Sequence, residues 1–236
     1  MSYRLDAFLA HAGLGSRTEV RRLIKRRRIM VNGTTCRVLD HPLSDGDEVV
    51  CDGEPVVLPP ATIHLLVHKP VGYACSHDPR EAPLLDDLLD PLWRRAGVEP
   101  AGRLDRQTSG LLFCSTDGGL IHRLIHPRRK VAKRYRIAYS GDLVTDAIAR
   151  CAAGFPLAEG DRPTRPADLQ LDGPGQATLI LHEGRFHQVR RMIATLGGVV
   201  TALHRDRIGQ LELPADLAPG QVRPASEGEL VALQDR

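Results

Sequence analysis

The segment from Gly102 to Leu112 brings together side chains that could act on a substrate. Asp105 supplies a carboxylate and Arg103 a guanidinium, and an apolar run follows at 111–114. This pattern predicts a buried strand preceded by a polar loop, and such loops often hold catalytic residues. Taken alone, these residues favour a simpler interpretation, in which the Asp105 carboxylate only caps a turn.

Two further segments extend the pattern. Lys133-Arg134-Tyr135 follows a basic run, and residues 183–192 read Glu-Gly-Arg-Phe-His-Gln-Val-Arg-Arg-Met. In this order, the three motifs resemble those of the pseudouridine synthases, specifically the family that modifies ribosomal RNA and carries a small RNA-binding domain in front. Residues 1–57 resemble an S4 RNA-binding domain and residues 63–236 the catalytic domain, with 58–62 as a linker. The short form without a basic tail looks most like the enzymes for the small-subunit (16S) RNA.

The resemblance implies roles for individual side chains. Asp105 matches the catalytic aspartate, and Tyr135 matches the aromatic residue that lies against the uracil ring. Arg185 matches the arginine that pairs with the aspartate, which would lower the pKa of the carboxyl and orient it. Arg103 matches the arginine that fills the space left by the flipped base. The family usually shows Asn-Lys-Pro where this chain has His68, a departure that affects only a local hydrogen bond.

The reaction implied by the resemblance breaks a C–N glycosidic bond and forms a C–C bond without a change of oxidation state. It therefore needs no redox cofactor and no metal, so we expect no cofactor. The sequence agrees, because it has neither a Gly-x-x-x-x-Gly-Lys loop nor a His-Glu-x-x-His zinc motif. Its five cysteines are scattered, which predicts neither a zinc site nor a disulfide framework and indicates a reducing, cytoplasmic compartment.

The first 57 residues predict two short helices and a small hairpin sheet. Ser16 and Glu19 form a capping-box pattern at the start of the second helix, and Asn32-Gly33 is a strong hairpin signal. This helix carries seven basic residues against one acid, and we expect it to bind RNA phosphates without sequence specificity, although such a run can also be a solvated face. The residues assigned to RNA binding here are Arg17, Arg21, Arg22, Lys25, Arg26 and Arg28.

The remainder of the chain mixes strand and helix patterns without a regular βαβ order. We expect strands at 63–67, 134–139 and 178–182 and helices at 86–93 and 188–196. The predicted fold class is therefore α+β, with a mixed, largely antiparallel sheet. The acid-free run 121–136, which includes Lys133, is expected to form one wall of a basic groove, and Arg190 and Arg191 to extend it.

The charge and hydrophobic content of the chain indicate which partners it can bind. The 236 residues carry a net charge of only +3, and 28 of the 32 basic residues are arginines, a bias that suits phosphate binding but that a G+C-rich genome would also produce. No signal-peptide core and no apolar run of membrane-spanning length is visible, which predicts a protein without a membrane partner.

The sequence thus predicts an rRNA pseudouridine synthase of the 16S type, acting on ribosomal RNA in a partly assembled small subunit, with a monomer as the default state. A large-subunit (23S) enzyme of the same family is the first alternative. A catalytically silent ribosome-assembly protein is the second, although a pure binding module has no need of an ionised Asp beside an Arg. A small-molecule isomerase fits poorly with the basic helix.

Overall fold

The computed structural model describes residues 3–58 and 62–234. The chain divides into two compact units, one formed by residues 1–63 with 90–98 and the other by residues 64–89 with 99–236. The predicted linker, 58–62, lies largely outside the described residues, which omit 59–61. Within the described residues no helix is both long enough and apolar enough to cross a membrane.

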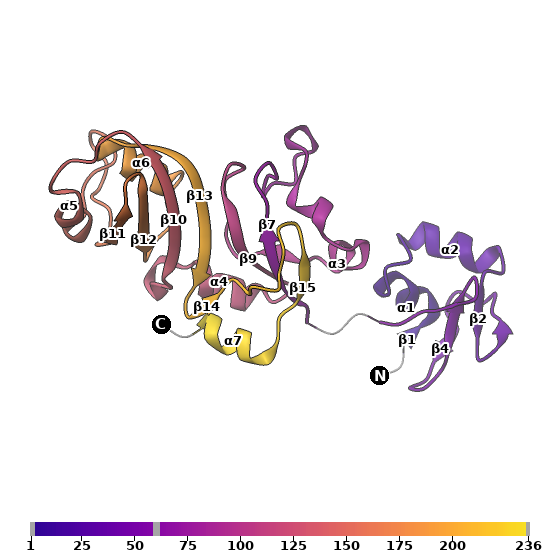
Figure 1. Cartoon of the computed structure of the whole chain (residues 1–236). Coiled ribbons are helices and arrows are strands. Elements are labelled where there is room, and N and C mark those ends of the chain that lie inside the picture. Colours follow the sequence, from indigo (N-terminus) through magenta and orange to yellow (C-terminus); the bar gives the residue numbers. More distant parts are fainter. Residues whose placement is uncertain (1–2, 59–61, 235–236) are drawn as a thin grey trace. The chain divides into compact units, whose positions relative to one another are not determined.

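In the first unit, residues 3–58 form two helices and two small antiparallel sheets (Figure 1). Ser16 and Glu19 form the predicted capping box, in which the Ser16 backbone N–H donates to the Glu19 carboxylate at 2.7 Å. The Asn32-Gly33 hairpin is also present, with both residues at positive φ. The elements are α1 (Leu5–His11), α2 (Arg17–Lys25), β1 (Tyr3–Arg4), β2 (Ile29–Val31), β3 (Thr34–Thr35), β4 (Pro42–Leu43), β5 (Val49–Cys51) and β6 (Glu54–Pro55).

The helix expected at 86–93 is wrong as a single element. The structure instead has a 3₁₀ turn, η2 (Leu85–Leu88), and a separate short helix, α3 (Pro91–Arg95). Pro91 lacks a backbone N–H and cannot continue a helix from the preceding turn, but it is well suited to a first helical position. Asp90 caps the new helix by accepting a hydrogen bond from the Leu92 N–H at 2.7 Å.

The second unit is built on one mixed sheet, which confirms the α+β prediction. Its strand order is β11-β12-β10-β13-β9-β7-β15, and β14 and β8 pair with β13 and β9. The strands are β7 (His64–Lys69), β8 (Glu99–Pro100), β9 (Ser109–Ser115), β10 (Lys133–Ser140), β11 (Asp168–Gly173), β12 (Gln176–Leu181), β13 (Val199–Ile208), β14 (Leu211–Glu212) and β15 (Val222–Pro224). The helices are α4 (Gly118–Ile125), α5 (Ala147–Ala153), α6 (Gln188–Thr195) and α7 (Glu227–Gln234), with 3₁₀ turns η1 (Pro79–Glu81) and η3 (Pro127–Arg129).

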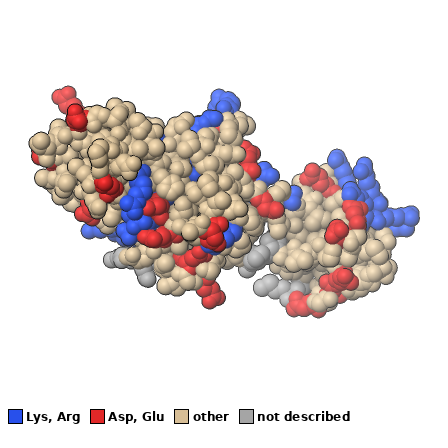
Figure 2. All heavy atoms as spheres, in the orientation of Figure 1, with Lys and Arg blue, Asp and Glu red and all other residues tan. Residues whose placement is uncertain are grey.

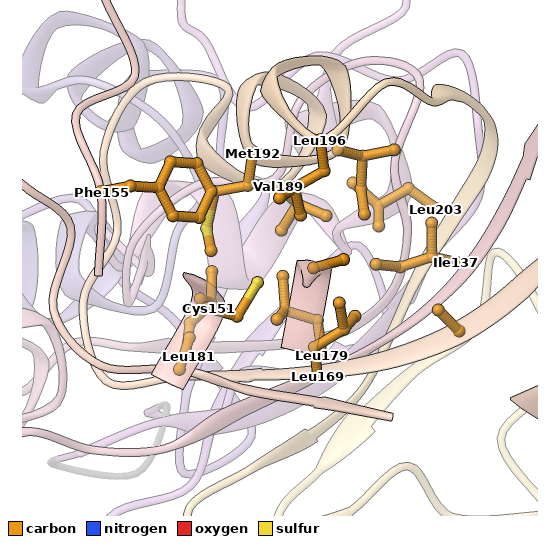
Figure 3. Packing of buried hydrophobic residues seen from close by; sticks show 14 residues of the cluster. Ile137, Cys151, Phe155, Leu169, Leu179, Leu181, Val189, Met192, Leu196 and Leu203 are labelled. Atoms are coloured by element: carbon orange, nitrogen blue, oxygen red, sulfur yellow. The ribbon is translucent and has the colours of Figure 1, made fainter. Parts of the chain in front are cut away.

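One hydrophobic core packs α5 and α6 against β10 to β13 (Figure 3). Alternate residues of β10 face it: Ile137 is buried, and Tyr135 and Tyr139 pack against its edge. From α6, Met192 and Ile193 are almost fully buried, as their helical spacing predicts. Each such side chain removed from water stabilises the fold by about 1.5–3 kcal/mol.

A second core lies around β9, α4 and α7 and is centred on Leu111 and Phe113. The two parts of the sheet meet where β9 runs parallel to β13, and the pairing there is short, His204 with Ser109 and Arg205 with Gly110. Every other strand pairing of the described residues in this sheet is antiparallel. We call this short parallel pairing the seam.

Gly110 makes the seam possible. Its φ is +118°, and a Cβ atom built on it would lie 2.1 Å from the carbonyl oxygen of Arg205. A side chain of any size would therefore push β13 away from β9. Asp105 lies five residues before this glycine, so the close approach also fixes where the Asp105 loop leaves the sheet.

Candidate active site

The loop that carries Asp105 joins β8 to β9 and is held from several directions. The Thr108 N–H donates to the Asp105 carbonyl at 2.9 Å, which closes a turn inside the loop. From outside, the Gly72 N–H donates to the Arg106 carbonyl at 2.8 Å, and the Arg190 guanidinium donates to the Gln107 carbonyl at 2.9 Å. The backbone that carries the carboxylate is thus restrained by one hydrogen bond within the loop and by two from other segments of the chain.

A pocket of about 270 Å³ opens beside this loop. It is small among ligand pockets, of a size that suits one planar base. The Asp105 loop, the start of β10 and the turn from 183 to 188 that leads into α6 line it, together with residues of α4, η3, β12 and β13. Residues singled out from the sequence that meet here are Arg103, Asp105, Lys133, Tyr135 and Arg185.

Asp105 approaches a histidine that the sequence reasoning did not single out. The Nε2 atom of His187 lies 3.5 Å from Asp105 Oδ1, and both side chains are partly exposed to solvent. His187 has a positive φ of 50° and precedes the first residue of α6. It lies inside the 183–192 motif, from which Arg185, Arg190 and Arg191 were assigned to the site and His187 was not.

Arg185 lines the pocket but is not paired with Asp105, which corrects the partner that the resemblance implied. Its guanidinium donates to the carbonyl oxygens of Arg162 and Pro163, at 2.6 and 2.5 Å, and its Nε lies 3.4 Å from Glu183. Glu183 also accepts hydrogen bonds from the Gln188 side chain and from the Arg165 N–H. In this structure Arg185 therefore braces the 183–188 turn instead of holding the Asp105 carboxylate.

Tyr135 enters the pocket from β10, where it pairs with Arg205 of β13 on one side and with Leu179 of β12 on the other. A register shift between Arg134 and Tyr135 marks an irregularity in β10 at this point. Because residues paired across strands share a face of the sheet, Tyr135 and Arg205 both project toward the pocket. The position of the tyrosine ring is therefore fixed by a strand that is paired on both sides.

Basic side chains lie at the pocket and near it, and two of them, Lys69 and Arg205, are buried. Arg205 is 2% exposed; its Nε donates to the Leu111 carbonyl at 3.0 Å, and one terminal nitrogen has no hydrogen-bond partner among the described residues. Burial, together with the nearby Arg205, lowers the pKa of Lys133 to about 8. Lys69 is fully buried, and burial likewise lowers its pKa, although Cys75 and Asp105 partly offset this effect. Lys133 and Arg205 line the same pocket as Asp105, so positive charge lies beside the carboxylate.

Lys69 and Arg205 were not assigned to the site from the sequence. Lys69 precedes Pro70 in the His-Lys-Pro segment, and the sequence does not show that its side chain is completely buried. Arg205 lies in a strand whose neighbours include other charged and polar residues, so no sequence signal distinguishes it from an exposed arginine.

The basic residues assigned to RNA binding fall into two groups. Along α2, the residues Arg17, Arg21, Arg22, Lys25 and Arg26 are exposed and form the α2 basic face, and Figure 2 shows Lys and Arg gathered over this part of the first unit. Arg28 is exposed but forms an ion pair with Asp52. The α2 basic face is therefore exposed, whereas the charge of the nearby Arg28 is neutralised by Asp52.

In the second unit, several expected groove residues bind protein groups instead. Arg191 pairs with Asp161 at 2.7 Å, and Arg190 holds the Asp105 loop. Arg134 and Arg136 both bind Asp206. Burial opposes ionisation of Asp206, but the hydrogen bonds from these arginines outweigh it and lower the pKa of the carboxyl. The basic wall expected from residues 121–136 is therefore partly neutralised.

One pocket is thus lined by an acidic, an aromatic and several basic side chains, a set that suits an enzyme acting on a polar, planar substrate. A family model described as RNA pseudouridylate synthase matches residues 63–195, and an S4 domain model matches residues 4–49. The chain belongs to the RNA pseudouridylate synthase family.

Named relatives cover the chain almost completely. It is 36% identical over 232 residues to the "Ribosomal small subunit pseudouridine synthase A" of Escherichia coli strain K12, covering 98% of this chain and 99% of that protein. It is 34% identical to the "Uncharacterized RNA pseudouridine synthase YtzG" of Bacillus subtilis, with 98% of each covered. A solved "pseudouridylate synthase" structure matches with 31% identity and a TM-score of 0.69, covering 98% of this chain and 99% of that one.

Proposed function

We propose that this protein converts a specific uridine of small-subunit (16S) ribosomal RNA to pseudouridine, with Asp105 as the catalytic group. The observation that carries the proposal is the meeting of Asp105 and Tyr135 in one base-sized pocket. The full-length similarity to small-subunit enzymes of this type supports the choice of RNA. We place the reaction in the cytoplasm, with a partly assembled small subunit as substrate and a monomer as the acting form.

The reaction is an isomerisation that the site's own groups can support. The N1–C1′ bond breaks, the uracil turns within the pocket, a C5–C1′ bond forms, and the proton on C5 is released while N1 gains one. Asp105 supplies a carboxylate, a group that can act as a nucleophile or a base in this reaction. Tyr135 lies against the ring and limits how the detached base can move.

The target uridine must leave its stack before it can enter a pocket of this size, and unstacking costs a few kcal/mol. Arg103 is exposed at the pocket edge, on the Asp105 loop. Its flat guanidinium can stack in the space left by the base and bond phosphate, which offsets part of that cost. The α2 basic face supplies affinity that does not depend on sequence.

Tritium release tests the proposal. RNA labelled with tritium at C5 of uridine is prepared as 16S and 23S RNA, each free and bound to ribosomal proteins, and incubated with the wild-type chain and with Asp105→Asn. We expect release from 16S RNA with the wild type and none with the variant. Release from 23S RNA alone would overturn the choice of subunit, and silence on every RNA with binding intact would favour the assembly-protein alternative.

A further inference from the structure

Phe186 is an exposed aromatic residue at the edge of the catalytic pocket. It is 73% exposed and lies in the turn between β12 and α6. Its ring stacks on that of His187, with the ring centres 3.9 Å apart and the planes 15° from parallel. Both rings line the pocket, and His187 is the residue whose Nε2 approaches Asp105. One ring therefore separates Phe186 from the catalytic carboxylate.

A single exposed phenylalanine is common on protein surfaces and needs no explanation by itself. This one differs because its support is rigid. The turn that carries it is braced by Arg185 and by the bond from the Gln188 side chain to Glu183, and Gln188 is almost fully buried. The phenylalanine ring thus has one face covered by His187 and much of the remainder open to solvent.

The chemistry that recognises such a surface is a flat π system. In single-stranded or locally opened RNA, bases stack on aromatic side chains, and this interaction tolerates every base because each has a π face. When one nucleotide is flipped into a pocket, its neighbours are left without a stacking partner at the pocket mouth. A supported aromatic ring at that position can replace it.

We propose that Phe186 is a stacking platform for the base next to the target uridine, and so a substrate-positioning residue distinct from the catalytic groups. The inference rests on the proposed function, since it needs a flipped uridine in the pocket. Its contribution differs from that of Arg103, which is charged and comes from the Asp105 loop. A phenyl ring contributes through stacking alone, so its effect on binding does not weaken as salt rises.

The test uses a short RNA that contains the target uridine found by the tritium experiment, together with the same RNA made abasic at either neighbouring nucleotide. The proteins are the wild type, Phe186→Ala, Phe186→Tyr and the control Ile148→Ala. Ile148 is 51% exposed on α5 and does not line the pocket, so it matches the removal of an exposed apolar side chain. Circular dichroism verifies that every variant is folded.

We expect Phe186→Ala to raise KM about 5- to 140-fold, the equivalent of about 1–3 kcal/mol for one stacked base, with kcat nearly unchanged. Phe186→Tyr should retain wild-type KM, and Ile148→Ala should have no effect. Removing the stacked neighbour from the RNA should raise the wild-type KM to a similar extent and abolish the difference between the wild type and Phe186→Ala. The ratio of the two KM values on intact RNA should not change with KCl concentration.

Two results would overturn the inference while leaving the proposed function intact. One is an active Phe186→Ala with a KM within about twofold of the wild type on intact RNA. The other is a defect of equal size on RNAs that lack either neighbouring base, since the ring would then act on something other than a base. Absence of tritium release by the wild type itself would instead remove the proposed function, and this inference with it.

Discussion

Replacing Gly110 by alanine tests whether the seam controls the catalytic loop. The new Cβ would lie 2.1 Å from the Arg205 carbonyl oxygen and 2.7 Å from its amide nitrogen. Ordinary van der Waals separation begins near 3.4 Å, so the strands must separate by more than about 1 Å. The positive φ adds strain of about 1–3 kcal/mol, and each weakened hydrogen bond adds about 1 kcal/mol. We expect a total destabilisation of about 2–5 kcal/mol.

Two assays measure the effect of Gly110→Ala. Thermal unfolding should show a Tm lowered by roughly 4–20 °C, given the 2–4 °C expected per kcal/mol for a unit of this size. Tritium release should fall about 100-fold or more, because a shift of about 1 Å in a catalytic group has that effect on rate. The reasoning is refuted if Gly110→Ala keeps both the Tm and the rate of the wild type.

Gly118→Ala is the matched control for this change. Gly118 is the first residue of α4, and a Cβ there would meet nothing within 4 Å. Alanine in a helix removes backbone freedom from the unfolded chain, so stability should stay the same or rise slightly. A comparable destabilisation of both variants would show that the effect is general to glycine replacement and does not come from the seam.

Three further outcomes follow from the site and the basic helix. Asp105→Asn should abolish tritium release while RNA affinity, measured by filter binding, stays within a few fold; comparable turnover would remove Asp105 from its role. Changing Arg21, Arg22 and Lys25 to Gln should weaken RNA binding. The negative slope of log K against log salt should become shallower by about 0.7 for each phosphate that the helix no longer neutralises. An unchanged slope would show that α2 does not bind phosphate. Lys133→Met should raise the Tm at pH 7, because burial disfavours the ammonium. The folded pKa is about 8 against an ordinary 10.5, so the unfolded chain binds more protons between these values, and wild-type stability should rise with pH across that window. The advantage of Met should shrink accordingly as the pH approaches 10.5, and a difference independent of pH would contradict this account.

The sequence predicted elements whose signals are local. The capping box at Ser16, the Asn32-Gly33 turn and the strand at 134–139 each depend on a few neighbouring residues, and all three are present. The helix expected at 86–93 is wrong because Pro91 cannot continue the preceding turn and instead begins a separate helix.

The site was predictable as a set of segments but not as a set of side-chain partners. The motifs marked the loop of Asp105 and the turn before α6, which the structure brings to one pocket. Which arginine binds which acceptor depends on residues far away in sequence, such as the Arg162 carbonyl for Arg185 and Asp206 for Arg134. The burial of Arg205 has no local signal at all.

The seam also has a mechanical consequence. Asp105 belongs to the part of the sheet packed on the Leu111 and Phe113 core, whereas Tyr135 belongs to the part packed on α5 and α6. The two halves of the active site therefore lie on parts of the sheet that pack on different cores, and the seam is the strip of backbone where β9 of one part pairs with β13 of the other. Turnover should report the stiffness of that strip: a variant that loosens it becomes less active while both cores stay folded and every site residue remains in the chain.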